Sequence, residues 1–271
     1  RFPGVIIGMS GGVDSALSAI VAVDALGADR VHLVMMPSKY TSEESLIDAS
    51  DAARMMGCDI NSIPINDAVN AFDKTLLGPF AGTEADLTEE NLQSRIRAVI
   101  LMAISNKHGK MVLTTGNKSE MSVGYATLYG DMCGGYNALK DIYKLDVFKL
   151  CHWRNENHPA GGLGPRGQTM PANIIEKPPT AELRPDQKDE DSLPPYEVLD
   201  DILECLIEGE MLQKDIVKRG HDAETVARIQ HLLYIAEYKR RQSPPGVKIS
   251  AKNFGRDRRY PITNGYRDKR T

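Results

Sequence analysis

Cysteine is scarce in this chain of 271 residues, and both long apolar runs and an excess of basic charge are missing. The four cysteines lie far apart with no C-x-x-C pair, which argues against a disulfide framework and against a cysteine metal site. No apolar run approaches about 18 residues, and the N-terminus lacks the basic and apolar regions of a signal peptide. We therefore expect a cytoplasmic protein without a membrane segment.

The formal net charge of −4 argues against a dedicated nucleic-acid binder, because such proteins carry a basic excess that offsets phosphate. The charge is uneven. Residues 239–271 contain eleven Lys and Arg against two Asp and Glu, which makes this tail +9 and leaves −13 for residues 1–238. Such a tail is most often a solvated arm or one that contacts a second subunit; the alternative is contact with an anion or nucleotide.

Short apolar runs alternate with helix-length amphipathic stretches over the first 150 residues. Strands are expected at 5–9, 31–36, 59–63 and 111–114, and helices at 15–26, 41–56, 66–75, 88–108 (with Thr88 as N-cap) and 119–127. The alternation predicts an α/β fold with a doubly wound, mostly parallel sheet and helices on both faces. Ligands of such sheets bind beyond the carboxyl ends of the strands.

The character of the sequence changes after residue 153. We predict one domain, 1–271, that consists of an α/β core at 1–153, a lid or loop region at 154–195, helical additions at 196–242 and the basic tail at 243–271. The lid region is rich in Gly, Pro and Asn, and it holds an acidic cluster at 186–191 that we expect to be mobile. Helices are expected at 196–208, 212–219 and 222–241.

The strongest local signal is the octet that joins the first expected strand to the first helix, Gly8-Met9-Ser10-Gly11-Gly12-Val13-Asp14-Ser15. Small residues let backbone N–H groups converge on a phosphate, and the helix N-terminus adds partial positive charge. Asp14 would repel a bare phosphate unless a divalent cation bridges the two. The octet is neither a P-loop nor a G-x-G-x-x-G dinucleotide motif. The alternative is an ordinary glycine-rich turn with Ser as a cap.

A second polar stretch, residues 114–120, again follows an expected strand and enters a helix, and residues 124–131 continue it. Thr and Gly at a strand tip allow close approach of an adenine or ribose. Glu120 and Asp131 are placed to join Asp14 around Mg²⁺ or to accept hydrogen bonds from ribose hydroxyls. Taken alone, Glu120 and Lys118 are each more often solvated surface residues.

The octet resembles the PP-loop of the N-type ATP pyrophosphatases, enzymes that cleave ATP to AMP and pyrophosphate on an adenine nucleotide alpha hydrolase-like fold. Further segments are similar to the glutamine-dependent NAD synthetases within this superfamily: Asn91-Leu92-Gln93-Ser94-Arg95, Lys177-Pro178-Pro179-Thr180-Ala181-Glu182-Leu183, Glu237-Tyr238-Lys239-Arg240-Arg241, and 254–257 with 261–264. These matches cover nearly the whole chain.

The resemblance implies that the chain is the synthetase domain of a carbon–nitrogen ligase. The nicotinate carboxylate of deamido-NAD attacks the α-phosphorus of ATP, and ammonia then displaces AMP from the adenylate to give NAD. Glutamine-dependent members carry an N-terminal nitrilase-like amidase domain that makes the ammonia. Nothing of that domain is present, so we expect an excised C-terminal piece that uses this ammonia or free ammonia. We also expect a homodimer or larger homo-oligomer through the helix at 88–108.

The resemblance also implies roles for individual residues. The ligand sets are Gly8, Met9, Ser10, Gly11, Gly12, Val13, Asp14, Ser15, Thr115, Lys144 and Thr180 for ATP; Asp14 and Glu120 for Mg²⁺; and Asn91, Arg95, Glu120, Tyr125 and Lys239 for deamido-NAD. Asp14, Lys144 and Lys239 are the implied catalytic residues. The two lysines make physical sense as cations that neutralise phosphate and developing charge.

The chain departs from the family patterns at three positions. The small ammonia-dependent members have a lysine where this chain has Leu128 and an aspartate near Gly135, so those substrate contacts are absent or made differently. Tyr238 replaces the usual histidine, and we assign it no catalytic role.

The nearest rival function is that of another PP-loop amidotransferase synthetase such as GMP synthetase. A sulfur-transfer enzyme is less favoured because a catalytic cysteine pair is missing, and a nucleotide-binding module with a degenerate site is less favoured because the charged site residues are intact.

Overall fold

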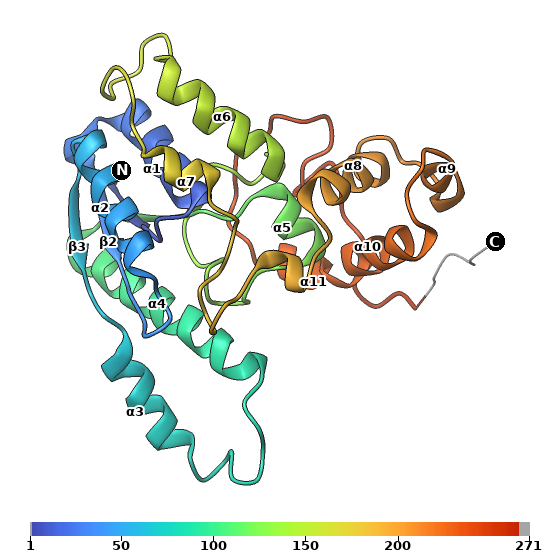
Figure 1. Cartoon of the computed structure of the whole chain (residues 1–271), viewed down its shortest axis with the longest axis horizontal. Coiled ribbons are helices and arrows are strands. Elements are labelled where there is room, and N and C mark those ends of the chain that lie inside the picture. The colour runs from blue at the N-terminus through green and yellow to red at the C-terminus, as the bar shows by residue number, and fades with distance from the viewer. Residues whose placement is uncertain (1, 266–271) are drawn as a thin grey trace.

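Five parallel strands form the sheet of this α/β protein (Figure 1), whose computed structural model describes residues 2–265. The order is β3-β2-β1-β4-β5, with Ile6 of β1 opposite His32 of β2 and Val112 of β4. The bounds are β1 Val5–Gly8, β2 Val31–Met35, β3 Asp59–Ser62, β4 Met111–Thr114 and β5 Tyr136–Asn137. Four strands lie where the sequence predicts them; β5 is too short to leave a periodic signal.

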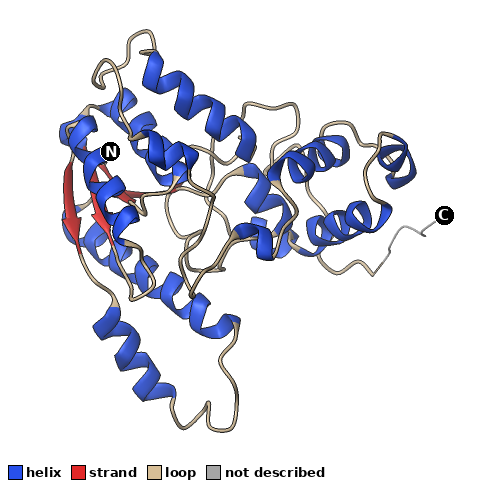
Figure 2. Ribbon diagram, viewed as in Figure 1, coloured by secondary structure: helices blue, strands red, loops and turns tan. Residues whose placement is uncertain are grey.

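Helices cover both faces of the sheet (Figure 2). Side chains alternate along β1, so Val5 and Ile7 face one layer of helices and Ile6 faces the other. The first layer contains α1 (Val13–Leu26), α2 (Glu43–Met56), α6 (Lys144–Glu156) and α7 (Ala172–Glu176); the second contains α3 (Asn66–Leu76) and α4 (Leu87–His108). The predicted fold class is confirmed.

Local capping explains two of the helix boundaries that differ from the prediction. Helix α4 is capped by Asp86 rather than Thr88: the Asp86 carboxylate accepts a hydrogen bond from the Thr88 N–H, and Glu89 accepts one from the Asp86 N–H. Helix α5 (Lys118–Val123) ends four residues earlier than predicted, because Gly124 adopts a left-handed conformation with φ +73°.

Helix α6 is the main element that the sequence pattern does not predict. Its buried residues are Lys144, Val147, Cys151 and Arg154, so half of its buried face is charged. Such a face leaves no apolar stripe of helical period for sequence reasoning to detect. The lid region predicted for 154–195 is also more structured than a loop, because it contains α7 and a short 3₁₀ helix, Asp189–Asp191.

The helical region has an apolar core of its own. It contains α8 (Tyr196–Ile207), α9 (Gln213–Lys218), α10 (Ala223–Ile235) and α11 (Glu237–Arg240), so the helix predicted for 222–241 is interrupted at Ala236. Leu199 and Ile202 of α8 pack with Ile229 of α10, and Phe254 of the tail completes the cluster. The first part of the basic tail is therefore packed against the domain.

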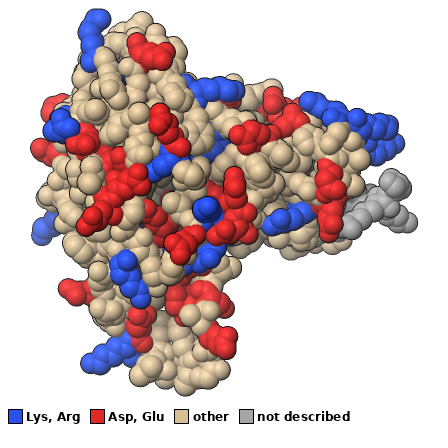
Figure 3. Space-filling model, viewed as in Figure 1, with Lys and Arg blue, Asp and Glu red and all other residues tan. Residues whose placement is uncertain are grey.

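Charged side chains of both signs are interspersed over the face shown in Figure 3. Among residues 2–265, none of the helices is long and apolar enough to cross a membrane.

Candidate functional site

The octet forms a closed turn between the end of β1 and the start of α1. Gly12 is the helix N-cap and has no side-chain cap, while the Ser10 hydroxyl accepts a hydrogen bond from the Gly12 N–H at 3.1 Å. The Ser15 hydroxyl accepts from the Ser10 N–H at 3.2 Å and donates to the Gly12 carbonyl at 2.9 Å. The serines therefore hold the turn in shape, and the helix N-terminus behind it suits an anion.

Gly11 explains why the turn is rich in glycine. Its φ is +81°, and a Cβ there would lie 2.3 Å from the carbonyl oxygen of Ser45 in α2. A side chain at this position would clash with backbone and would also strain the left-handed conformation. The turn thus packs directly on α2.

Two carboxylates and one ammonium meet beside this turn. The Lys144 ammonium lies 2.5 Å from Asp14 Oδ2 and 3.2 Å from Glu120 Oε1. Asn117 caps α5, and its side-chain amide donates to Asp14 Oδ1 at 2.8 Å. Because β1 and β4 are neighbours in the sheet, their carboxyl ends bring residues more than one hundred positions apart in sequence into contact.

Burial sets the electrostatics of this cluster. It raises the pKa of the Glu120 carboxyl to about 8; Lys144 acts in the opposite direction, while Asp14 and Asp189 raise the pKa further. Burial would lower the pKa of Lys144, but Asp14 and Glu120 outweigh it and hold the pKa above its ordinary value. With Asp189 nearby, three carboxyl groups surround the single ammonium, so the cluster has oxygen atoms to offer a second cation.

The residues fit Mg²⁺ when a phosphate group supplies the remaining oxygens. Within residues 2–265, no group of three or more His, Cys, Asp or Glu is arranged to hold a metal alone. Mg²⁺ is commonly bound through one or two carboxylates together with substrate phosphates and water. Asp14 and Glu120 provide two carboxylates that already converge on one cation, beside a turn suited to phosphate.

Two cavities open at this edge of the sheet. The larger, of about 750 Å³, is lined by twelve of the predicted site residues: Ser10, Gly12, Val13, Asp14, Ser15, Asn91, Thr115, Glu120, Tyr125, Lys144, Thr180 and Lys239. The smaller, of about 270 Å³, is lined by Gly8, Met9, Ser10 and Thr115 together with apolar residues such as Met35 and Leu101. Gly11 lines neither cavity because it faces α2.

Arg95 is the other predicted residue outside both linings. It is exposed, and its Nε donates to the Leu128 carbonyl at 3.2 Å. The nearby Lys239 ammonium does reach the larger cavity, where it donates to the carbonyls of Gly124 and Ala126 at 2.8 and 2.7 Å. Burial lowers the pKa of Lys239, and Arg95 lowers it further while Asp131 raises it.

Sequence reasoning misses two residues of the site. Asn117 links α5 to Asp14, and the capping-box pattern of Asn117 with Glu120 three residues later was available as a signal. Asp189 lines the larger cavity, is buried, and accepts a hydrogen bond from the Tyr196 hydroxyl at 2.8 Å. No sequence signal separates Asp189 from the other acidic residues of its cluster.

The lid segment, defined here as residues 177–191, lies across both cavities. Ala181 and Leu183 each line both cavities. The Glu182 carboxylate accepts hydrogen bonds from the hydroxyls of Ser42 and Ser45 at 2.8 Å each, which fixes the segment to the start of α2. The ammonium of Lys177, at the start of the segment, pairs with Asp48 of α2 at 2.8 Å.

This arrangement agrees with the comparisons with known proteins. The family described as NAD synthase matches residues 1–243. The chain belongs to the NAD synthase family. It is 56% identical over 268 residues to the glutamine-dependent NAD(+) synthetase of Rhodobacter capsulatus, covering 99% of this chain and 49% of that protein. It is 51% identical over 266 residues to that of Acinetobacter baylyi, covering 98% and 48%.

A solved structure is similar to this chain in both sequence and fold. The glutamine-dependent NAD+ synthetase from Acinetobacter baumannii, in complex with ADP, is 48% identical with a TM-score of 0.62, covering 97% of this chain and 46% of that one. The chain therefore spans about half the length of these three relatives. The resemblance to glutamine-dependent NAD synthetases, which are carbon–nitrogen ligases, is confirmed.

Proposed function

We propose that this chain is the synthetase part of a glutamine-dependent NAD synthetase and amidates deamido-NAD to NAD at the expense of ATP. The observation that carries the proposal is the cluster of Asp14, Lys144 and Glu120, which lies at the phosphate turn on the wall of a cavity of about 750 Å³. A cavity at the upper end of small-molecule sites suits a dinucleotide.

ATP is assigned to the phosphate turn and the smaller cavity. The turn and the α1 N-terminus supply N–H groups for the phosphates. The apolar wall beside the turn, which includes Met35 and Met36, suits a planar adenine. Thr115 lines both cavities and is placed for the ribose or the phosphates that lie between them. Thr180, on the lid segment, also lines the larger cavity.

Deamido-NAD is assigned to the larger cavity. Asn91, Tyr125 and Lys239 provide polar groups on one wall, and Glu120 lies at the end near the phosphate turn. The Lys239 ammonium has three donors, two of which contact backbone carbonyls, so one remains for an anionic group of the substrate. Arg95 is exposed and is assigned only to a part of the substrate that extends past Leu128.

The proposed chemistry has two steps. A carboxylate oxygen of the nicotinate bonds to the α-phosphorus of ATP, and the bond to the β-phosphate oxygen breaks to release pyrophosphate. Ammonia then attacks the activated carbonyl carbon, loses a proton to solvent and displaces AMP. The chain needs no protein nucleophile: it aligns the two substrates, and Lys144 and Lys239 neutralise their charge.

Mg²⁺, held by Asp14 and Glu120, would neutralise the phosphate charge and favour departure of pyrophosphate. Asp14 and Glu120 then have a further function, which is to keep Lys144 between them and beside the phosphate turn.

The length of the relatives supports one further partner, a domain that precedes this chain. We propose that ammonia is supplied by an N-terminal amidase domain in the full-length protein, and that this chain alone uses free ammonia. We also propose a cytoplasmic homodimer or larger homo-oligomer through α4, and a division into core (1–153), lid (154–195), helical region (196–242) and basic tail (243–271).

The proposal is tested by supplying ATP, Mg²⁺, an ammonium salt and either deamido-NAD or xanthosine monophosphate, and measuring AMP and pyrophosphate. AMP release with deamido-NAD is expected. Turnover with xanthosine monophosphate alone would identify a GMP synthetase instead. Tight ATP binding with no turnover on either substrate would indicate a nucleotide-binding module.

A further inference from the structure

Lys118 is fully buried and lies outside the two cavities, in the first turn of α5 between Asn117 and Glu120. Its ammonium contacts Asp141 at 2.7 Å and Glu208 at 2.6 Å. Burying a lysine is costly unless it is paired and hydrogen-bonded. Replacing such a group with apolar packing is often neutral or stabilising, so its presence is not explained by stability alone.

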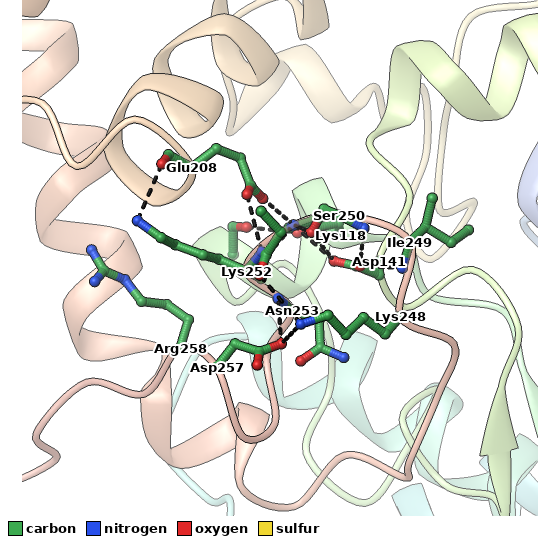
Figure 4. Close-up of polar contacts among 12 residues, drawn as sticks. Lys118, Asp141, Glu208, Lys248, Ile249, Ser250, Lys252, Asn253, Asp257 and Arg258 are labelled. Atoms are coloured by element: carbon green, nitrogen blue, oxygen red, sulfur yellow. Dashed lines mark hydrogen bonds and ion pairs between the residues drawn. The ribbon is translucent and has the colours of Figure 1, made fainter.

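The tail supplies the other half of this lysine's surroundings (Figure 4). The Lys118 ammonium donates to the Ser250 hydroxyl at 2.6 Å and to the Lys252 carbonyl at 3.1 Å. Asp141 in turn accepts from the N–H groups of Ile249 and Ser250 at 2.7 and 2.6 Å. We name residues 248–253 the tail clamp, because they join Asp141 to Lys118.

The clamp also reaches the helical region. The Lys252 N–H donates to Glu208 Oε2 at 3.1 Å, and Glu208 lies just past the end of α8. Immediately before the clamp, the Pro245 carbonyl accepts from the N–H of Asn137, whose side-chain amide donates to the Gly116 carbonyl. The tail therefore contacts the 116–120 turn at Lys118 and, through Asn137, at Gly116.

The turn that is held in this way carries the polar groups of the site. Asn117 contacts Asp14 and Glu120 contacts Lys144 on the cavity side, while Lys118 points to the clamp. Ser119, the remaining residue of the turn, donates to Asp200 of α8 and accepts from the backbone N–H of Lys144. The same turn therefore contacts the site through Asn117 and Glu120 and the clamp through Lys118.

We infer that Lys118 is a positioning residue for the proposed reaction and that the tail clamp, acting through it, sets the separation of Glu120 from Asp14. The inference is tested by two measurements. The activity measurement rests on the proposed function, whereas the measurement of cation binding does not. Groups that orient metal ligands without touching the metal commonly change metal affinity by about 10–100-fold when they are removed.

The decisive experiment measures Mn²⁺ binding by electron paramagnetic resonance in the presence of α,β-methylene-ATP, with no second substrate. The variant is Lys118→Met, which keeps the length and removes the charge. The matched control is Arg154→Met. Like Lys118, Arg154 is a buried cation, but it lies in α6 and pairs with Asp24 at 2.7 Å. Arg154 lies ten residues beyond Lys144, about 15 Å along the helix.

Both substitutions are expected to lower the melting temperature, but only Lys118→Met is expected to weaken Mn²⁺ binding, by about tenfold or more. Arg154→Met should stay within about twofold of the unsubstituted chain. Equal Mn²⁺ affinity in Lys118→Met, or an equal loss in both variants, would overturn the inference. If Lys118→Met does not fold, Ser250→Ala is the deciding variant. It removes the two hydrogen bonds of the hydroxyl, one from Lys118 and one to Asp141, and leaves both charges paired with each other. About threefold weaker Mn²⁺ binding is expected, and unchanged binding would mean that the clamp is only structural.

Activity separates this inference from the proposed function. In Lys118→Met, the Mg²⁺ concentration that gives half-maximal AMP release should rise with the loss of Mn²⁺ affinity. KM for deamido-NAD should rise by a smaller factor, because Glu120 is only one of the residues assigned to that substrate. A rise in both by the same factor would indicate general damage and contradict positioning. If the unsubstituted chain releases no AMP from deamido-NAD, the proposed function fails, and the Mn²⁺ measurement still decides the role of Lys118.

Discussion

Asp14→Asn is the most informative single substitution in the site. The Asp14 carboxylate accepts from the Asn117 amide at 2.8 Å and from the Lys144 ammonium at 2.5 Å. An asparagine offers one acceptor oxygen and one NH₂ group, so one of these two donors loses its partner. Losing a hydrogen bond to a charged group costs about 1.5–3 kcal/mol of folding free energy. Lys144 keeps Glu120 as a partner, so the fold should survive.

The catalytic loss should be larger than the loss of stability. Asn removes one of the two carboxylates proposed to hold Mg²⁺, and removing one electrostatic contact from a preorganised site typically lowers kcat by about 10²–10³-fold. AMP release at saturating ATP and deamido-NAD measures the change, and urea unfolding measures the stability. We expect a folded protein with turnover at or below about one hundredth of normal.

The matched control is Asp146→Asn, which removes the same charge from the first turn of α6. Asp146 is half exposed and pairs with Lys149 rather than with the site. Its turnover should stay within about twofold of normal, since exposed pairs contribute about 0–1 kcal/mol. Near-normal turnover in Asp14→Asn, or equal losses in the two variants, would remove Asp14 from the site.

Three further predictions concern the turn, the helical region and the pH dependence. Gly11→Ala should cost about 1–3 kcal/mol in urea unfolding and weaken ATP binding in calorimetry, because its Cβ meets the Ser45 carbonyl and φ is +81°; unchanged ATP affinity would contradict the close packing. Leu199→Ala, at a fully buried position in α8, should cost about 2–5 kcal/mol in the same assay, and a loss below about 1 kcal/mol would mean that the helical core is not well packed. Burial raises the pKa of Asp200 to about 6, so its protonated form stabilises the fold below about pH 4 and this contribution is lost as pH rises through about 6. Between pH 4 and 7, the free energy of unfolding of the unsubstituted chain should therefore fall by up to about 3 kcal/mol more than that of Asp200→Asn. If the two free energies change in parallel with pH, the assignment is wrong.

The sequence predicts the part of the fold in which local and tertiary signals agree. Strands β1, β2 and β4 are short apolar runs between turn residues, whereas β3 is mostly polar and exposed. The positions of all four strands and their parallel arrangement are confirmed. The phosphate turn is equally visible, because its glycines are required by the backbone: Gly11 packs against α2 at a distance that no side chain allows.

The rest depends on contacts that only the folded chain creates. Helix α6 places Lys144 and Arg154 on its buried face, where each pairs with a carboxylate from a distant segment. Because these buried positions are charged, the sequence shows no apolar stripe that would predict the helix. Lys118 looks like a surface lysine until the tail folds over it. Asp189 is one acid among several, and only the packing of α8 beside it singles it out.

The lid segment has a consequence for the order in which ligands act on one another. Ala181 and Leu183 belong to the walls of both cavities, and Glu182 between them is fixed to α2. Residues 181–183 therefore form part of the boundary between the two cavities, and a displacement of this segment that enlarges one cavity changes the other. Under the proposed assignment, filling the smaller cavity with adenine would alter the affinity of the larger cavity for the dinucleotide, and the reverse effect would have the same magnitude. Titrating α,β-methylene-ATP with and without deamido-NAD measures that coupling, and identical affinities would mean that the partition is rigid.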